Sequence, residues 1–273
     1  MRPTTAELQI NGTTPPFRSG DLPALQSVQR SFRTGIAASP LSAQGFTEGN
    51  AYNTQYHFLC QLQPSETVAG HKVALTTKAA RDHLGVHEPC YGHILSPCVY
   101  ANDAEVPIGN LAAPHIEAEI AFVLRKDLRG PGVTSVDVMR ATGGVLPALE
   151  LVDLKVQGDG IQATDVIIHN ALHGGIVAGS RLCSLDSLDL QYEGVTVEYN
   201  GELHGSGTGA EVMGNPINPI VWLANKLAEF GDYLRAGETI ISGSMVTPVE
   251  VKPGDYVKAT YTRMGSVGAR FVE

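Results

Sequence analysis

The sequence predicts an α+β fold with a small helical N-terminal part and a strand-rich body. Helical spacing of apolar residues is concentrated near the N-terminus and in one later segment. From Lys72 onward, short β-branched runs are separated by Gly and Pro, which is typical of strands and turns. Because the helices are few and unevenly placed, regular alternation of strands and helices fails. A parallel doubly wound sheet is therefore not expected.

The N-terminal part is expected to cover residues 1–68, with the β-rich body over 69–273. The first 20 residues are rich in Thr, Pro and Gly and predict an arm. A second helix is expected over Glu48 to Leu62. Before it, Asp21 suits the cap of a first helix, in which apolar residues recur at Leu22, Leu25, Val28, Phe32 and Ile36.

The body is expected to contain strands over "HKVALTT", "HIEAEIAFVL" and "VLPALELVDL". The segment "VTVEYNGELHGSG" alternates around Asn200-Gly201, which predicts a two-residue hairpin. Asn218 and Pro219 suit the cap and first position of a helix that ends at Gly231. The last residues, "YVKATYTRMGSVGARFVE", return to strands.

Composition limits the possible partners. Hydrophobic residues make up 43% of the chain and charged residues 17%, which is typical of a globular protein. The net charge of −9 argues against nucleic acid or an anionic membrane as a partner. Without a signal peptide or a long apolar run, a cytoplasmic protein is expected. No C-x-x-C spacing occurs, so we expect reduced thiols at Cys60, Cys90, Cys98 and Cys183.

Two carboxylates interrupt the apolar segment "PHIEAEIAFVL". Side chains alternate between the two faces of a strand, so His115, Glu117 and Glu119 share one face. Burying either carboxylate unpaired costs on the order of several kcal/mol or forces it to take up a proton. A positive centre between the two is therefore expected.

A divalent metal ion would be such a centre. Hard cations such as Mg²⁺ and Mn²⁺ prefer carboxylate oxygens, and Glu150 in "PALELVDL" offers a third carboxylate. Asp153 is less suited, because three positions along a regular strand place it on the opposite face. The alternative is that these glutamates are exposed on a half-solvated sheet.

The segments "HIEAEIAFVL", "LRGPG", "VLPALELVD" and "GSVGARF" resemble the fumarylacetoacetate hydrolase superfamily. The similarity is to its branch of 2-oxopent-4-enoate hydratases and 4-oxalocrotonate decarboxylases, from about Ala51 to the C-terminus. It implies a mixed β-sandwich roll, a catalytic domain over 69–273 and a homo-oligomer, or pairing with a related hydratase or decarboxylase. It also implies Mg²⁺ or Mn²⁺ on Glu117, Glu119 and Glu150.

The resemblance implies further site residues. Lys72, in "AGHKVALTT", matches a functional lysine that could bind a substrate carboxylate or move a proton, with a pKa lowered by burial. Cys90, in "EPCYGHI", stands where the hydratases have an acid, although it could equally be a packing residue. In "IIHNALHGG", Asn170 matches a D-N-A-S-S pattern, whereas His169 replaces its acid and His173 replaces a small residue.

The departure at Cys90 favours a decarboxylase of a 2-oxo-enedioate acid, acting on a small anionic substrate through a metal-stabilised dienolate in aromatic compound catabolism. A thiol activates water poorly, because its unperturbed pKa is about 8.5. A 2-oxopent-4-enoate hydratase is the closest alternative. Hydrolysis of a C–C bond would need a water-activating dyad that the sequence does not reveal. A non-catalytic partner subunit of such an enzyme is a further alternative, because Cys90 and His169 both depart from the pattern.

Overall fold

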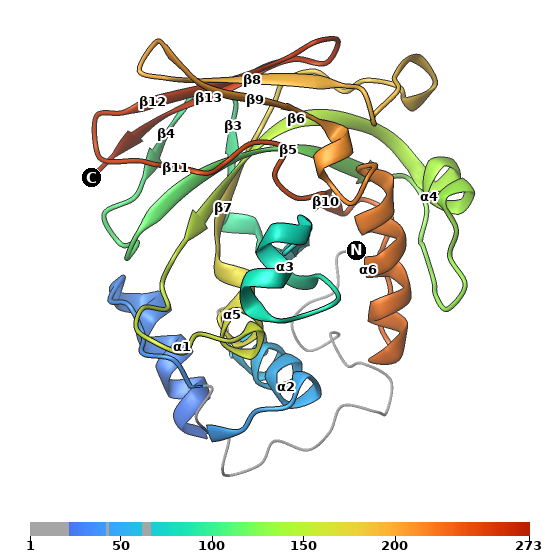
Figure 1. Ribbon diagram of the computed structural model, residues 1–273. Coiled ribbons are helices and arrows are strands. Elements are labelled where there is room, and N and C mark those ends of the chain that lie inside the picture. Colours follow the sequence, from blue (N-terminus) through green and yellow to red (C-terminus); the bar gives the residue numbers. More distant parts are fainter. Residues whose placement is uncertain (1–21, 42–43, 62–66) are drawn as a thin grey trace.

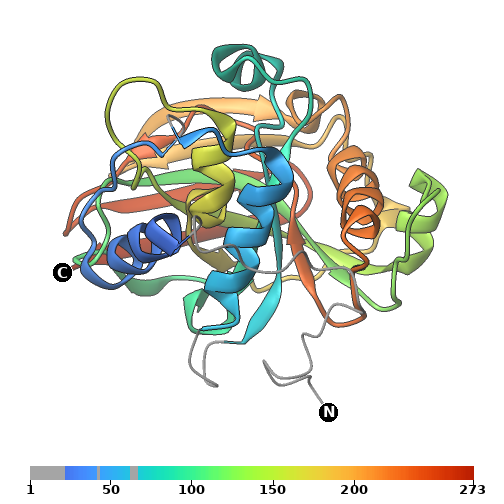
Figure 2. The same ribbon diagram turned by 90° about the horizontal axis from the view of Figure 1, so that it is seen from below.

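The computed structural model describes residues 22–41, 44–61 and 67–273. The expected arm and the Asp21 cap of the first helix lie outside these residues. The second helix was expected to reach Leu62, but it ends at Leu59, and Cys60 and Gln61 form a turn. Two sheets lie one above the other, and the N-terminal helices lie on the far side of the larger sheet (Figures 1 and 2). The expected α+β roll is confirmed.

Helices α1 (Leu22–Thr34) and α2 (Glu48–Leu59) form the described N-terminal part. The apolar spacing in α1 buries Leu25 and Val28. The predicted extension of this helix to Ile36 is wrong, because Gly35 takes a left-handed φ of 63° and ends it. Ile36 is exposed. Helix α2 is capped by Thr47, whose hydroxyl accepts a hydrogen bond from the Asn50 N–H at 3.3 Å.

The larger sheet has eight strands, seven of them in the order β2-β1-β10-β5-β6-β7-β3, with β11 also beside β5. Strand β1 is parallel to β10 and β3 to β7, whereas the other pairs are antiparallel. The strand expected over "HKVALTT" begins earlier and ends at Ala74. The bounds are β1 Val68–Ala74, β2 Cys90–Leu95, β3 Val99–Ala101, β5 Pro114–Leu124, β6 Thr142–Asp153, β7 His173–Ala178, β10 Thr239–Ile241 and β11 Val249–Glu250.

The smaller sheet has five strands in the order β4-β13-β12-β8-β9. The predicted hairpin joins β8 and β9, and Asn200 and Gly201 both take positive φ values, 52° and 84°, as its two-residue turn requires. The C-terminal strands are confirmed as β12 and β13. The bounds are β4 Ala104–Pro107, β8 Gly194–Tyr199, β9 Glu202–Thr208, β12 Tyr256–Tyr261 and β13 Gly265–Val272.

The central strands β5 and β6 are buried on both faces. One face, which includes Ile116, Ile120 and Phe122, joins the main core with residues of β12 and β13. The Tyr261 hydroxyl crosses between the sheets and donates to the Glu119 carbonyl at 2.6 Å. The other face carries a small apolar cluster of Ile94, Ala121, Ala148, Ile176 and Ile241. That second face also carries the carboxylates.

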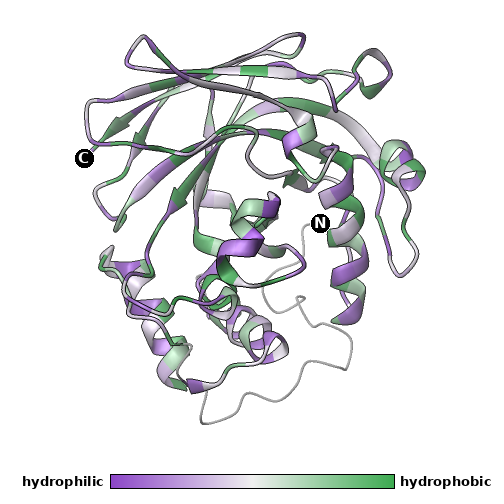
Figure 3. Ribbon diagram, in the orientation of Figure 1, coloured by the Kyte–Doolittle hydropathy of each residue, from purple (hydrophilic) through white to green (hydrophobic). Residues whose placement is uncertain are grey.

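Helix α6 (Ile217–Glu229) carries both apolar and polar residues (Figure 3) and contacts β1. The predicted cap at Asn218 and first position at Pro219 are each wrong by two residues. The helix begins after Pro216, and the Asn215 side chain accepts the Ile217 N–H at 3.0 Å, while Asn218 instead donates to Met213. The predicted end is confirmed by Gly231, whose φ is 74°.

Three short helices complete the described part, α3 (Lys78–Leu84), α4 (Ser135–Ala141) and α5 (Ala163–Ile168). Short 3₁₀ turns lie between several of the elements, including one over Asn170–Leu172 between α5 and β7. None of the described helices combines the length and the apolar character that a membrane crossing requires.

Candidate active site

Three glutamates meet on one face of the larger sheet. Glu117 on β5 and Glu150 on β6 are direct partners in the antiparallel register, so their side chains leave the sheet on the same side. Glu119 lies two residues further along β5, on the same face. One oxygen from each carboxylate lies within 4.8 Å of the others. The sequence prediction of this cluster agrees with the geometry, and Asp153 is not part of it.

Each of the two fully buried carboxylates has one oxygen engaged and one without a partner. Glu150 Oε1 faces Lys72 Nζ at 3.0 Å and His173 Nδ1 at 3.2 Å, whereas Oε2 has no hydrogen-bond partner. Glu119 Oε2 accepts the Gly243 N–H at 2.6 Å, whereas Oε1 has none. Buried polar atoms without partners are rare in folded proteins. Two such oxygens beside a third carboxylate fit a hard divalent cation.

The electrostatics of the cluster indicate the same need for positive charge. Burial and the nearby Glu150 raise the pKa of Glu117 to about 7. Burial, with Glu150 and Glu117, also raises the pKa of Glu119 well above its ordinary value. Burial acts against ionisation of Glu150 too, but Lys72 and His173 outweigh it and hold the pKa of Glu150 below its ordinary value. A bound cation would favour the ionised form of all three.

Lys72 lies at the centre of this arrangement. It projects from β1, and besides Glu150 its ammonium contacts the Ala171 carbonyl at 2.9 Å. The expectation that burial lowers the pKa of Lys72 is wrong in this structure. Burial does act in that direction, but Glu150, Glu117 and Glu119 outweigh it, so the pKa is raised. Lys72 is therefore a buried cation that offsets part of the carboxylate charge.

A left-handed turn positions the Ala171 carbonyl. Three consecutive residues, Asn170, Ala171 and Leu172, have φ values of 56°, 50° and 61°. Asn170 fixes the turn against β2, because its side chain accepts the His93 N–H at 2.7 Å and donates to the His93 carbonyl at 2.9 Å. A Cβ on Gly92 would lie 2.4 Å from the Asn170 carbonyl oxygen, so β2 needs glycine there.

Comparison with known proteins identifies the family of this chain. Residues 67–272 match the family described as "Fumarylacetoacetate (FAA) hydrolase C-terminal". The chain belongs to this fumarylacetoacetate hydrolase family. The resemblance inferred from the sequence motifs is therefore confirmed.

Curated family members include both hydratases and a decarboxylase. The 2-oxo-hept-4-ene-1,7-dioate hydratase of Escherichia coli is 36% identical over 247 residues, 88% of this chain and 92% of the relative. The 4-oxalocrotonate decarboxylase of Pseudomonas putida is 35% identical over 227 residues, 83% of this chain and 86% of the relative. Hydratases and decarboxylases are both lyases, so these relatives support lyase chemistry for the family. They carry out two different reactions, hydration and decarboxylation.

A solved family member matches almost the whole chain. The 4-oxalocrotonate decarboxylase of Pseudomonas putida G7, complexed with magnesium and adipate, superposes with a TM-score of 0.90 at 31% identity. The match covers 94% of this chain and 99% of that one. The same enzyme is also known complexed with calcium and acetate. These ions agree with the divalent metal cofactor expected from the sequence.

Cys90 and His169, which the sequence resemblance marked as departures from the family pattern, are both buried. Cys90 opens β2 opposite Ala74, on the face that carries Lys72, and burial raises the pKa of its thiol to about 12. His169 donates from Nδ1 to the Asp165 carbonyl at 2.9 Å, and burial lowers its pKa to about 4. Both groups are therefore uncharged at neutral pH.

Sequence reasoning gave His173 no partner and missed Lys155. His173, which the resemblance placed among the site residues, opens β7 and contacts Glu150. Lys155 follows β6, is buried, and donates to the His173 carbonyl at 3.0 Å. A lysine directly after the apolar run "ALELVDL" was the available signal.

Proposed function

We propose that the protein is a divalent-metal-dependent decarboxylase of a 2-oxo-enedioate acid similar to 4-oxalocrotonate. The observation that carries this proposal is a three-glutamate cluster beside a buried, neutral thiol, Cys90. Such a site can stabilise negative charge but has no carboxylate at Cys90 to activate water. The magnesium-bound 4-oxalocrotonate decarboxylase among the solved relatives supports the same reaction.

A divalent cation held by Glu117, Glu119 and Glu150 would supply electrophilic stabilisation to the 2-oxo group of the substrate. Glu119 and Glu150 would each offer the oxygen that has no protein partner. The remaining oxygens are fixed by the Gly243 N–H and by Lys72 with His173, so the ligand oxygens are oriented before a cation binds.

Lys72 is the proton donor and anion-binding group of the proposed reaction. Its ammonium lies 3.0 Å from Glu150 Oε1, close enough to contact a substrate oxygen at the same centre. When the bond to the departing carboxylate breaks, the electron pair moves through the conjugated chain to the 2-oxygen. That oxygen then needs one proton, which Lys72 can provide. No carbon has to be protonated and no water has to be added.

A hydratase is the second candidate, because the E. coli relative that is 36% identical is a hydratase. Hydration needs a group that takes a proton from water. The Cys90 thiol is a weak hydrogen-bond acceptor, and ionising it costs more after burial. A non-catalytic partner subunit is a third candidate, and it would release no CO₂ with or without metal.

Metal removal and restoration tests the proposal. The protein is treated with a chelator, assayed for CO₂ release from 2-oxo-3-hexenedioate, and assayed again after Mg²⁺ or Mn²⁺ is added. We expect loss of turnover on chelation and recovery with either ion. Full turnover by the chelated protein would contradict the metal assignment, and no turnover after metal is bound would contradict the decarboxylase. Homo-oligomerisation and pairing with a related enzyme stay predictions for solution measurements.

A further inference from the structure

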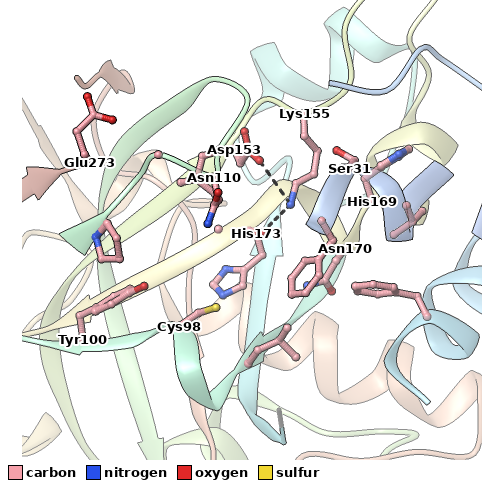
Figure 4. Close-up of a pocket in the computed structure, with 18 residues that line it drawn as sticks. Ser31, Cys98, Tyr100, Asn110, Asp153, Lys155, His169, Asn170, His173 and Glu273 are labelled. Carbon is pink, nitrogen blue, oxygen red and sulfur yellow. Dashed lines mark hydrogen bonds and ion pairs between the residues drawn. The ribbon is translucent and has the colours of Figure 1, made fainter. Parts of the chain in front are cut away.

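A cavity of about 380 Å³ is lined by His173, the residue that contacts Glu150 (Figure 4). This volume is in the range of sites for small ligands. Its apolar side includes Phe32 of α1, Phe58 of α2 and Leu95 of β2. Its polar side includes Ser31, Asn110, Lys155, His169 and His173.

One residue, His173, belongs both to the lining of the cavity and to the surroundings of the glutamates. His173 lines the cavity and contacts Glu150 through Nδ1 at 3.2 Å. Asn170, which fixes the turn that places the Ala171 carbonyl on Lys72, also lines it. None of Glu117, Glu119 and Glu150 lines the cavity, so His173 and Asn170 stand between the glutamates and this space.

Polar atoms at the cavity lack protein partners. The Ser31 hydroxyl is buried and makes no hydrogen bond, although its residue is only 3% exposed. The Nε2 atoms of His169 and His173 are also buried without partners. Since buried polar groups usually find partners, three such atoms at one cavity indicate a polar ligand, with or without ordered water.

Lys155 gives the cavity a cation. Its ammonium has three N–H donors. One of them donates to the His173 carbonyl at 3.0 Å. The nearest carboxylate oxygen, on Asp153, is 3.9 Å from the ammonium. This contact is an ion pair, but it is longer than a hydrogen bond. Asp153 Oδ1 is instead held by the Ala112 and Ala113 N–H groups, both at 2.9 Å. The ammonium therefore remains able to bind a second anion.

We propose that this cavity is the subsite for the second carboxylate of the substrate, with Lys155 and Ser31 as its main donors. The proposal rests on the proposed function, because the first carboxylate and the 2-oxo group must lie at the glutamates. In Figure 4 the Asn110 side chain also faces this space, as a further donor. The Nδ1 atoms of His169 and His173 face a carbonyl and a carboxylate, so Nδ1 carries the proton and Nε2 can accept a hydrogen bond from water between the lining and the carboxylate. The subsite selects diacids over monoacids.

The test compares binding of two unreactive acids of equal chain length to the Mg²⁺-loaded protein by calorimetry. 2-Oxoadipate carries a second carboxylate and 2-oxohexanoate does not. We expect the wild type to bind 2-oxoadipate about ten- to a hundredfold more tightly, in keeping with one charge-assisted contact. Lys155→Met should remove most of this preference, and Lys155→Arg should retain part of it.

Two further variants keep the test decisive. Ser31→Ala removes a hydroxyl that has no protein partner, so it should fold normally and weaken 2-oxoadipate binding severalfold while leaving 2-oxohexanoate unchanged. Lys258→Met, in the smaller sheet, makes the same charge change away from the cavity and should keep the full preference.

Oxalate binding shows whether a negative result contradicts only the subsite or also the proposed function. It offers only the metal-binding end of the substrate, and Mg²⁺-dependent oxalate binding should be the same in wild type, Lys155→Met and Ser31→Ala. Normal oxalate binding with no preference between the two longer acids would overturn the subsite alone. Absence of Mg²⁺-dependent oxalate binding would overturn the proposed function and the subsite with it. A preference that survives both Lys155→Met and Ser31→Ala would also overturn the subsite.

Discussion

Glu117 and Glu150 are direct partners on the adjacent strands β5 and β6, and their carboxylates share one face with Glu119. A cross-strand pair of like charges destabilises a sheet unless something positive lies between the two. Lys72 supplies one positive charge to the three carboxylates. The remaining formal charge is that of two carboxylates, which a divalent cation would neutralise.

Replacing any one of Glu117, Glu119 and Glu150 with glutamine should preserve the fold and remove metal binding and activity. An amide has a similar volume but lacks the charge that holds a hard cation. Asp153→Asn is the matched control, because Asp153 binds backbone N–H groups and lies outside the cluster. Metal content of the purified variants is the measurement. Normal Mg²⁺ binding by Glu119→Gln would show that the assignment is wrong.

Lys72→Met should lower turnover about ten- to a hundredfold, the value of a charge-assisted contact in the transition state. Metal binding should be retained, because removing a cation from beside Glu150 makes the cluster more negative. Turnover and metal affinity are measured on the same preparation. Equal losses of both would point to a structural role for Lys72.

The contribution of Glu117 to the stability of the metal-free protein should fall as pH rises through the range between 4.5 and about 7. Burial and Glu150 raise the pKa of Glu117 from 4.5 to about 7, so the folded state binds this proton more tightly than the unfolded state. Stability from such a group is present at low pH and is lost as the carboxyl ionises. Mg²⁺ should reverse the trend, because it binds the ionised form.

The corresponding measurement is the melting temperature of chelated and Mg²⁺-loaded protein across this pH range. Glu117→Gln cannot ionise there, so the melting temperature of the chelated wild type relative to that of chelated Glu117→Gln should fall as pH rises. A difference that stays constant or grows between these pH values would contradict the electrostatic description of the cluster.

The sequence predicted the cluster because strand alternation is a short-range rule. Glu117 and Glu119 share a face wherever β5 lies, and the apolar run around Glu150 predicted a second buried strand. The direct pairing of Glu117 with Glu150 depends on the register between β5 and β6, which no local pattern supplies. The family resemblance supplied the third ligand.

The pKa of Lys72, the contacts of Asn170 and the position of Lys155 were beyond sequence reasoning for a related reason. The pKa of Lys72 depends on three carboxylates from other strands, and the sum of their effects exceeds that of burial. Asn170 acts through the β2 backbone, 77 residues away in sequence. The proposed role of Lys155 depends on a cavity whose lining residues come from segments far apart in the sequence. The boundary errors at α1 and α6 are local and leave the site unaffected.

Cys90→Asp should shift the protein toward hydration. A carboxylate would then stand on the face that carries Lys72, where the hydratases have an acid by resemblance, and it could take a proton from water. The absolute rate should stay low, because His169 also differs from the pattern. The measurement is loss of dienol absorbance with 2-hydroxypenta-2,4-dienoate. Cys90→Ser, which keeps the size and stays neutral, is the control and should not hydrate.

The most direct test of the decarboxylase assignment is a paired assay of the wild-type, Mg²⁺-loaded protein. CO₂ release is measured with 2-oxo-3-hexenedioate, and loss of dienol absorbance is measured with 2-hydroxypenta-2,4-dienoate. A three-glutamate site beside a neutral thiol should release CO₂ from the first substrate and hydrate the second slowly or not at all. Efficient hydration of the dienoate with no CO₂ from the diacid would contradict the account and identify the protein as a hydratase.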